Sequence, residues 1–142
     1  MPQVGETFFT IVGCMDGRVQ GPAAEFGRQK FGAEYPDTIT EAGLVGKLAQ
    51  ENTDQELLDS VKNKLDISFE KHHSKGIVVH GHQECVGNPV SDDEHKDEIR
   101  KSVQKIKSLI NSSVPVVGAF AKRSSKHPSK WEVEEISPTV LI

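Results

Sequence analysis

Two short stretches of this 142-residue chain carry the side chains best suited to binding a metal or moving a proton. The first, residues 13–18, reads Gly-Cys-Met-Asp-Gly-Arg, so a thiol, a carboxylate and a guanidinium occupy alternate positions. The second, residues 80–85, reads His-Gly-His-Gln-Glu-Cys. Each stretch comes at the end of an apolar run rich in strand formers. Both are therefore predicted to be turns at the carboxyl ends of buried strands.

Cys14, His82 and Cys85 form a candidate zinc site, provided that the two turns meet. Zinc accepts thiolate and imidazole ligands, and a set of two cysteines and one histidine leaves its fourth position open. Only two residues separate His82 from Cys85, so one turn can offer both ligands to one ion. His80 is an alternative ligand, but it would lie within the strand, and we therefore assign the role to His82.

Asp16 and Arg18 are the candidate catalytic residues beside that open position. Asp16 lies two residues after Cys14, close enough to accept a hydrogen bond from a water molecule on the metal. Arg18 can hold this carboxylate through two parallel hydrogen bonds, which keeps it ionised and oriented. In an alternative arrangement, Asp16 swings inward and closes the fourth position itself.

The sequence also contains a possible nucleophile, Cys14 itself, and several titratable residues outside this candidate site. Cys14 could serve as the nucleophile of a thiol or phosphate enzyme, but a phosphatase loop of the Cys-x5-Arg type needs an arginine where this chain has Gln20. That activity is therefore disfavoured. Several further histidines and glutamates are predicted to face solvent: His72, His73, His95, His127, Glu41 and Glu84.

The elements that must position the two turns alternate between strands and helices. Strands are predicted over residues 7–12, 37–40, 77–80, 114–121 and 131–136. A helix is predicted over about 23–31, since Gly21-Pro22 suggests a helix start with proline at the first helical position. Two further helices are predicted after a capping box at 53–56 and after a second box at 91–94. Helices between strands imply right-handed crossovers and a mostly parallel sheet covered on both faces, a three-layer α/β fold. The short loop before the fifth strand predicts that this strand is antiparallel.

The bulk properties fit one domain over residues 1–142. A net charge of −4 and a pI of about 5.9 give no reason to expect nucleic acid as a partner. No apolar segment is long enough to span a membrane, and the first residues do not resemble a signal peptide. We therefore expect a cytoplasmic protein in which the two cysteines are ligands rather than a disulfide.

Taken together, the two motifs resemble those of β-class carbonic anhydrases. Residues 14–18 are similar to the family's Cys-x-Asp-x-Arg motif, and residues 82–85 to its His-x-x-Cys motif. The resemblance implies zinc on Cys14, His82 and Cys85, an Asp16–Arg18 dyad, and reversible hydration of CO₂ to bicarbonate. It also implies a sheet of order 2-1-3-4 with an antiparallel fifth strand, and dimers or higher assemblies. We expect a homodimer that forms through the second strand.

The chain also departs from the family pattern. Members usually begin with a helical arm that embraces a partner subunit, whereas here the first predicted strand follows almost at once. Residues 40–43 read Thr-Glu-Ala-Gly where the family often has Arg-Asn-Ala-Gly, and Val86 stands where glycine is common after the last ligand. Two other functions therefore stay open: a non-catalytic zinc module, and a divergent enzyme for another CO₂-like molecule such as carbon disulfide.

Overall fold

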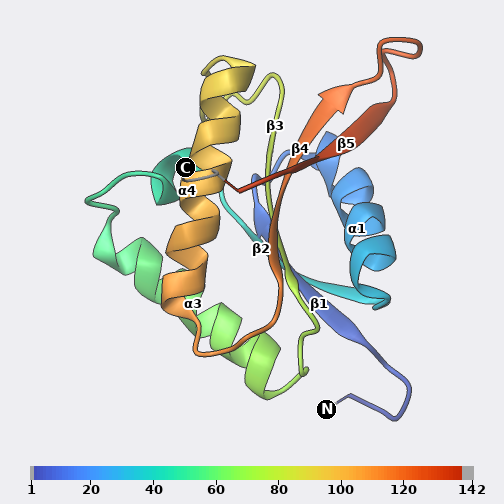
Figure 1. The fold of residues 1–142 in the computed structure, drawn as a ribbon, viewed down its shortest axis with the longest axis vertical. Helices are drawn as coiled ribbons and strands as arrows, with labels where there is room; N and C mark the ends of the chain where they lie inside the picture. The colour runs from blue at the N-terminus through green and yellow to red at the C-terminus, as the bar shows by residue number, and fades with distance from the viewer. Residues whose placement is uncertain (1, 139–142) are drawn as a thin grey trace.

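Five strands form a single sheet at the centre of the computed structural model, which describes residues 2–138 (Figure 1). The strand order is β2-β1-β3-β4-β5, and only the β4–β5 pair is antiparallel. The strands are β1 (Phe8–Gly13), β2 (Tyr35–Thr40), β3 (Ile77–His82), β4 (Val116–Arg123) and β5 (Trp131–Ile136). The helices are α1 (Gly17–Phe31), α2 (Leu44–Leu48), α3 (Gln55–Glu70) and α4 (Asp92–Leu109).

Helices cover both faces of the sheet, so the molecule has three layers. Helix α1 lies alone against one face, while α3 and α4 lie against the other (Figure 1). The α1 side buries a cluster that includes Phe9, Ile11 and Val78, and the opposite side a larger cluster that includes Leu65 and Ile99. The predicted α/β class, strand order and antiparallel fifth strand are confirmed.

The two motif-bearing turns leave neighbouring strands. β1 pairs in parallel with β3, with Gly13 opposite His80, so the chain leaves both strands at the same edge of the sheet. The chain after β1 goes to one side of this pair and the chain after β3 to the other, because β2 and β4 flank the pair. Ligands bind parallel sheets at such a reversal of strand order.

Two boundaries differ from prediction in ways that affect the site. Helix α1 begins at Gly17 rather than near residue 23, because the Asp16 carboxylate caps it by accepting from the Arg18 backbone N–H at 2.9 Å. Pro22 consequently lies inside the helix instead of at its first position. Strand β3 extends to His82, two residues further than predicted. His82, the first candidate ligand of its motif, therefore lies on the strand itself rather than in the turn after it.

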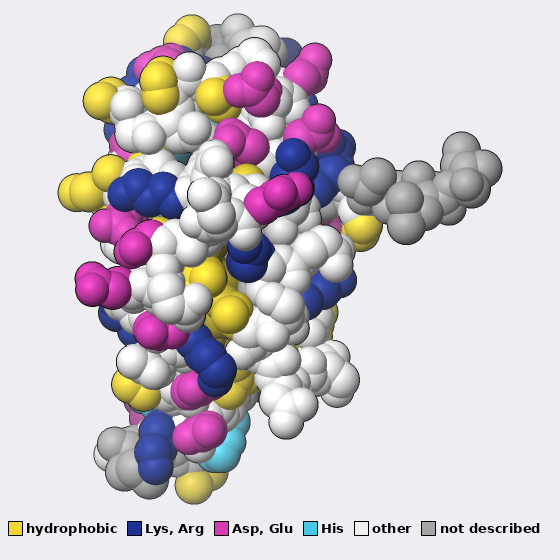
Figure 2. All heavy atoms as spheres, turned by 90° about the vertical axis from the view of Figure 1, so that its left-hand side faces the viewer, with side chains coloured by type: hydrophobic (Ala, Val, Ile, Leu, Met, Phe, Trp, Pro, Cys, Tyr) yellow, Lys and Arg dark blue, Asp and Glu magenta, His cyan; other side chains and the backbone are white. Residues whose placement is uncertain are grey.

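Charges of both signs are spread over the face that carries α3 and α4 (Figure 2). Lysine and arginine side chains are interspersed there with aspartate and glutamate. Within α3, Lys62 and Asp66 form one such ion pair. This face therefore offers no continuous basic surface of the kind that binds nucleic acid. Within residues 2–138, no helix combines the length and apolarity needed to cross a membrane.

Candidate metal centre

Cys14, His82 and Cys85 come together at the carboxyl ends of β1 and β3. One ligand atom from each lies within 4.8 Å of the other two, and all three residues are buried. The sulfur atoms of Cys14 and Cys85 are 3.8 Å apart. Two sulfurs at about 2.3 Å from one tetrahedral ion would be separated by roughly the same distance. The sequence-predicted ligands thus form a group that could hold a metal ion.

The His82 ring is oriented as a metal ligand requires. Its Nδ1 lies 2.6 Å from the Gln83 carbonyl oxygen and donates to it, which leaves Nε2 with a free lone pair. That Nε2 is buried and has no hydrogen-bond partner. An unpartnered buried nitrogen beside two thiols is costly unless an ion occupies the space between them. The donor set therefore fits a thiolate-binding metal such as zinc.

Without a cation, the electrostatics of the three candidate ligands favour the thiolate at Cys14 but protonation of His82 and Cys85. Burial alone would raise the pKa of the Cys14 thiol, but His82 and the backbone N–H of Gly43 lower it to about 6. The pKa of His82 is raised: its burial opposes this shift, and the Cys14 thiolate outweighs it. The pKa of Cys85 is raised by burial and by the neighbouring Cys14. A divalent cation would reverse this last effect, since it deprotonates a coordinating thiol.

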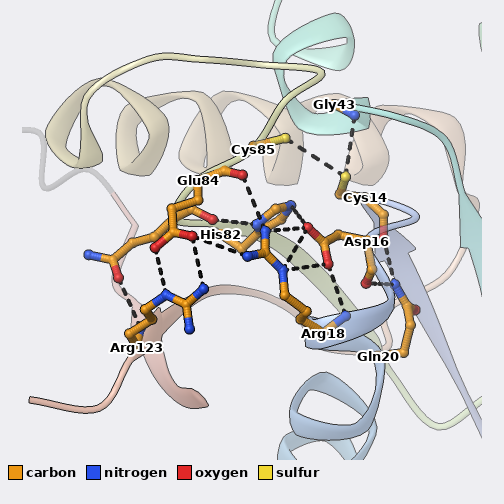
Figure 3. Close-up of polar contacts among 10 residues, drawn as sticks. Cys14, Asp16, Arg18, Gln20, Gly43, His82, Glu84, Cys85 and Arg123 are labelled. Carbon is orange, nitrogen blue, oxygen red and sulfur yellow. Dashed lines mark hydrogen bonds and ion pairs between the residues drawn. The ribbon is translucent and has the colours of Figure 1, made fainter. Parts of the chain in front are cut away.

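Asp16 and Arg18 form the predicted pair beside the ligands (Figure 3). Arg18 Nη2 donates to Asp16 Oδ2 at 2.8 Å and Arg18 Nε to Oδ1 at 3.1 Å. These hydrogen bonds lower the Asp16 pKa to about 2. Asp16 Oδ2 lies 4.0 Å from His82 Nε2, so the carboxylate reaches the edge of the ligand group. Its oxygens are turned toward Arg18, and the candidate ligand group comprises only the other three side chains among residues 2–138.

Hydrogen bonds from two residues, Gly43 and Gln20, fix the loop around Cys14, and neither residue was predicted to do so. The Gly43 backbone N–H donates to the Cys14 sulfur at 3.5 Å, and Gln20 Nε2 donates to the carbonyls of Cys14 and Asp16 at 2.8 Å each. Gly43 has φ of +62°, and a Cβ there would lie 2.4 Å from the Gly87 carbonyl oxygen. A glycine is therefore required where the loop after β2 meets the loop after β3.

Two residues predicted to face solvent, Glu84 and His95, lie beside the centre, although Glu84 is exposed as predicted. Glu84 binds Arg18 and Arg123 (Figure 3). Both guanidiniums also stack on Trp131, a residue that the sequence reasoning did not single out. His95 is buried, with its ring 6.4 Å from that of His82. The prediction of solvent exposure was wrong for His95 because its helix turns this position toward the sheet.

His72 is a second departure from the predicted solvent-facing set. Its Nδ1 lies 2.7 Å from Asp37 Oδ2, and its ring stacks on Phe8 at 4.1 Å. Asp37 also accepts from the buried Ser68 hydroxyl at 2.7 Å. This network joins β1, β2 and α3 away from the candidate ligand group. Its role is structural, because it links the edge strand β2 to helix α3.

An α/β protein with a Cys₂His group at the switch point of its sheet is the class that this fold and site define. The family described as "Putative carbonic anhydrase" matches residues 4–137. The chain belongs to the β-carbonic anhydrase family. A search of curated proteins gave no match.

Solved carbonic anhydrases, two of them described as β-carbonic anhydrases, share the fold at low sequence identity. Isoform I from Trichomonas vaginalis is 16% identical with a TM-score of 0.60, over 99% of this chain and 89% of that one. CafA from Aspergillus fumigatus is 13% identical with a TM-score of 0.55, over 96% and 79%. The carbonic anhydrase from Glaciozyma antarctica is 19% identical with a TM-score of 0.53, over 91% and 81%. At this level of identity, the likeness speaks for the fold alone.

Proposed function

We propose that the protein is a zinc-dependent carbonic anhydrase that hydrates CO₂ reversibly to bicarbonate. The observation that carries the proposal is the His82 Nε2 atom, buried and unpartnered between two thiols and 4.0 Å from an arginine-held carboxylate. Zinc bound by Cys14, His82 and Cys85 would supply Lewis acidity, which ionises water near neutral pH for attack on an electrophile. Thiolate ligands suit a reducing compartment, in keeping with a cytoplasmic location.

The chain's own residues orient the reactants. Asp16 stays ionised because Arg18 lowers its pKa to about 2, so it can accept a hydrogen bond from water at the open position. Arg18 holds both carboxylate oxygens, which keeps Asp16 from turning onto the metal as a fourth ligand. His82 keeps Nε2 available because Nδ1–H is committed to the Gln83 carbonyl.

Metal analysis and a CO₂ hydration assay test the proposal directly. The purified wild type is expected to carry about one zinc per chain and to hydrate CO₂ in a stopped-flow assay. Cys85→Ser should lose most of the metal and the activity, because a serine hydroxyl is a poor zinc ligand. Val86→Ser is the matched control: this neighbour is almost fully exposed, and the variant should keep both.

The outcomes separate the candidate functions. A fully active wild type that contains no metal would contradict the zinc assignment. A wild type that binds one zinc per chain without hydrating CO₂ would be a binding module or an enzyme for another small molecule.

We also propose that the protein assembles as a homodimer through the edge of β2. One solved structure of similar fold, from Sordaria macrospora, is described as a tetrameric β-carbonic anhydrase; it is 15% identical with a TM-score of 0.50, over 96% of this chain and 84% of that one. β2 is an outer strand of the sheet, and an outer strand offers unpaired backbone groups to a second copy.

A further inference from the structure

Arg18 makes more contacts than its pairing with Asp16 requires. Its Nη1 donates to Glu84 Oε1 at 3.1 Å, and its Nη2 approaches the Glu84 carbonyl oxygen at 3.4 Å (Figure 3). The guanidinium is therefore held on two sides. Asp16 belongs to the turn after β1, whereas Glu84 belongs to the turn that carries Cys85. One side chain thus links the two turns that supply the metal ligands.

Glu84 is in turn fixed by Arg123 at the end of β4. Arg123 Nε donates to Glu84 Oε2 at 2.6 Å and Arg123 Nη2 to Oε1 at 3.0 Å, a two-pronged pair. The remaining Nη1 donates to the Pro128 carbonyl at 2.7 Å, and the Arg123 backbone N–H donates to Gln83 Oε1 at 2.9 Å. A carboxylate held by a two-pronged arginine has a defined direction as well as a charge.

The indole ring of Trp131 packs against the guanidinium groups of both Arg18 and Arg123 and so restricts their orientation. The Arg18 and Arg123 guanidinium carbons lie 5.0 and 4.8 Å from the centre of its indole ring. Such stacking favours a guanidinium positioned over the ring face. The indole also meets the His82 ring at 6.3 Å, nearly edge-on. Through Trp131, strand β5 therefore contacts both arginines and the candidate ligand His82.

The backbone of Glu84 lies in a conformation that favours glycine. Its φ is +58°, in the left-handed region. For a residue with a Cβ this conformation costs roughly 1 kcal/mol or more, so glycine would relieve it. A glutamate at this position gives up that stability and gains only the contacts of its side chain. Those contacts go to the two arginines, which points to a task for the carboxylate at the site.

We propose that Glu84 and Arg123 are positioning residues that fix the Arg18 guanidinium and, through it, keep Asp16 oriented toward the open coordination position. Neither residue touches the reacting atoms. The consequence for catalysis rests on the proposed function, whereas the effect on Arg18 is a property of the protein without metal or substrate. Loss of Glu84 would leave Arg18 bound to Asp16 alone, and the pair could then rotate together onto or away from the metal.

Side-chain NMR of the metal-free protein tests the arrangement without any assay of activity. The chain has four arginines, and Arg18→Lys assigns the Arg18 signals. In the wild type, the two Nη nitrogens of Arg18 are expected to give separate resonances, because hydrogen bonds on both sides slow rotation about the Cζ–Nε bond. In Glu84→Gln these resonances should merge. In Glu84→Gly, which suits the backbone, they should merge as well.

Kinetics of the zinc-loaded protein test the consequence for the reaction. Glu84→Gln should lower kcat on the order of tenfold to a hundredfold with little change in KM, since misplacing a catalytic group affects the chemical step. Zinc content should stay at the wild-type value. Arg123→Leu should give a similar loss, Arg123→Lys should recover part of it, and the double variant with Glu84→Gln should lose little more than either alone.

A matched control separates this role from a general effect of surface charge. Glu25→Gln removes an exposed carboxylate that also pairs with an arginine, Arg28 at 3.7 Å on the same helix as Arg18. It should change neither the Arg18 signals nor kcat. Unchanged Arg18 resonances in Glu84→Gln would overturn the proposal, whatever the activity. Freed Arg18 resonances with a wild-type kcat would overturn the link to Asp16. A wild type without CO₂ hydration would refute the proposed function, while the NMR result would still decide the role of Glu84.

Discussion

Asp16 serves the local fold and the proposed chemistry with the same carboxylate. One oxygen, Oδ1, accepts the Arg18 backbone N–H and so caps helix α1. The same carboxylate accepts hydrogen bonds from the Arg18 side chain, and its Oδ2 atom lies 4.0 Å from His82 Nε2. A change at this position is therefore informative only if it preserves the cap. Asparagine does so, because it is as good a helix cap as aspartate.

Asp16→Asn is expected to lower kcat for CO₂ hydration on the order of a hundredfold while zinc stays bound. The variant keeps the size and the cap but loses the charge that orients water. Arg18→Ala should act mainly through Asp16, so the double variant should lose much less than the product of the two single losses. Stopped-flow kinetics with zinc analysis of all three variants provide the measurement. If the two losses multiply in full, the residues act independently and the dyad assignment fails.

Some residues of the candidate site can be predicted from the sequence, and others cannot. The difference is whether the residue type and its spacing along the chain are unusual. Cys14, His82 and Cys85 have rare ligand chemistry at fixed spacing, so the chain itself marks them. Glu84 and Arg123 are ordinary surface residue types that lie 39 positions apart. Only the register of β3 beside β4 brings them together. One local signal was present: a glutamate inside the ligand turn, which proved to have a positive φ.

At the scale of elements, hydrophobic periodicity predicted the type and order of the main strands and helices, but capping contacts decided where they end. The Ser91 cap of α4 was predicted and is confirmed, since its hydroxyl accepts from the Glu94 N–H at 3.2 Å. The predicted box at 53–56 is shifted: Asp54, not Thr53, caps α3. α1 starts early because Asp16 caps it, and Pro22 inside it was misread as a start signal. Competing polar caps only a residue or a turn apart cannot be ranked by periodicity.

The β2 edge carries the prediction about assembly. Tyr35 and Ile67 are 41% and 57% exposed, and Ile67 lines an open hollow between β2 and α3 together with Ile39. Pairing of two β2 edges would cover this surface. Ile67→Lys should raise the dimer dissociation constant roughly tenfold or more, because it would bury an unpaired charge at the interface. Val4→Lys places the same charge at a fully exposed position outside this hollow and should leave assembly unchanged. Light scattering over a range of concentrations provides the measurement; a wild type that stays monomeric throughout would contradict the prediction.

The core of the molecule contains two buried histidines, His80 and His95, in addition to its apolar side chains. His80 is 1% exposed, and neither of its ring nitrogens has a hydrogen-bond partner. Burial, helped by His82 and His95, lowers the His80 pKa from 6.5 to about 4. Burial likewise lowers the pKa of His95 to about 4, against a small opposite effect of Asp92. The folded state therefore resists protonation at two positions where the unfolded chain accepts protons near pH 6.5.

This difference predicts that the metal-free protein loses stability as the pH falls from about 6.5 toward 4. Between these values the unfolded chain binds more protons, so each histidine lowers the free energy of unfolding by up to about 1.4 kcal/mol per pH unit. His82 contributes with the opposite sign, because its pKa is raised in the folded protein. Its opposing effect makes a variant at His80 more informative than the pH profile alone.

His80→Leu removes one buried imidazole and leaves an apolar side chain of similar size in its place. The variant should be more stable than the wild type at pH 5 by an amount that shrinks as the pH rises to 8, because only the protonation of unfolded His80 has been removed. Urea unfolding of the metal-free protein, followed by the fluorescence of Trp131, the single tryptophan, provides the measurement at each pH. An equal change in the free energy of unfolding at pH 5 and pH 8 would mean that His80 takes up no proton when the chain unfolds. The acid sensitivity would then have to come from His95 and the candidate metal ligands instead.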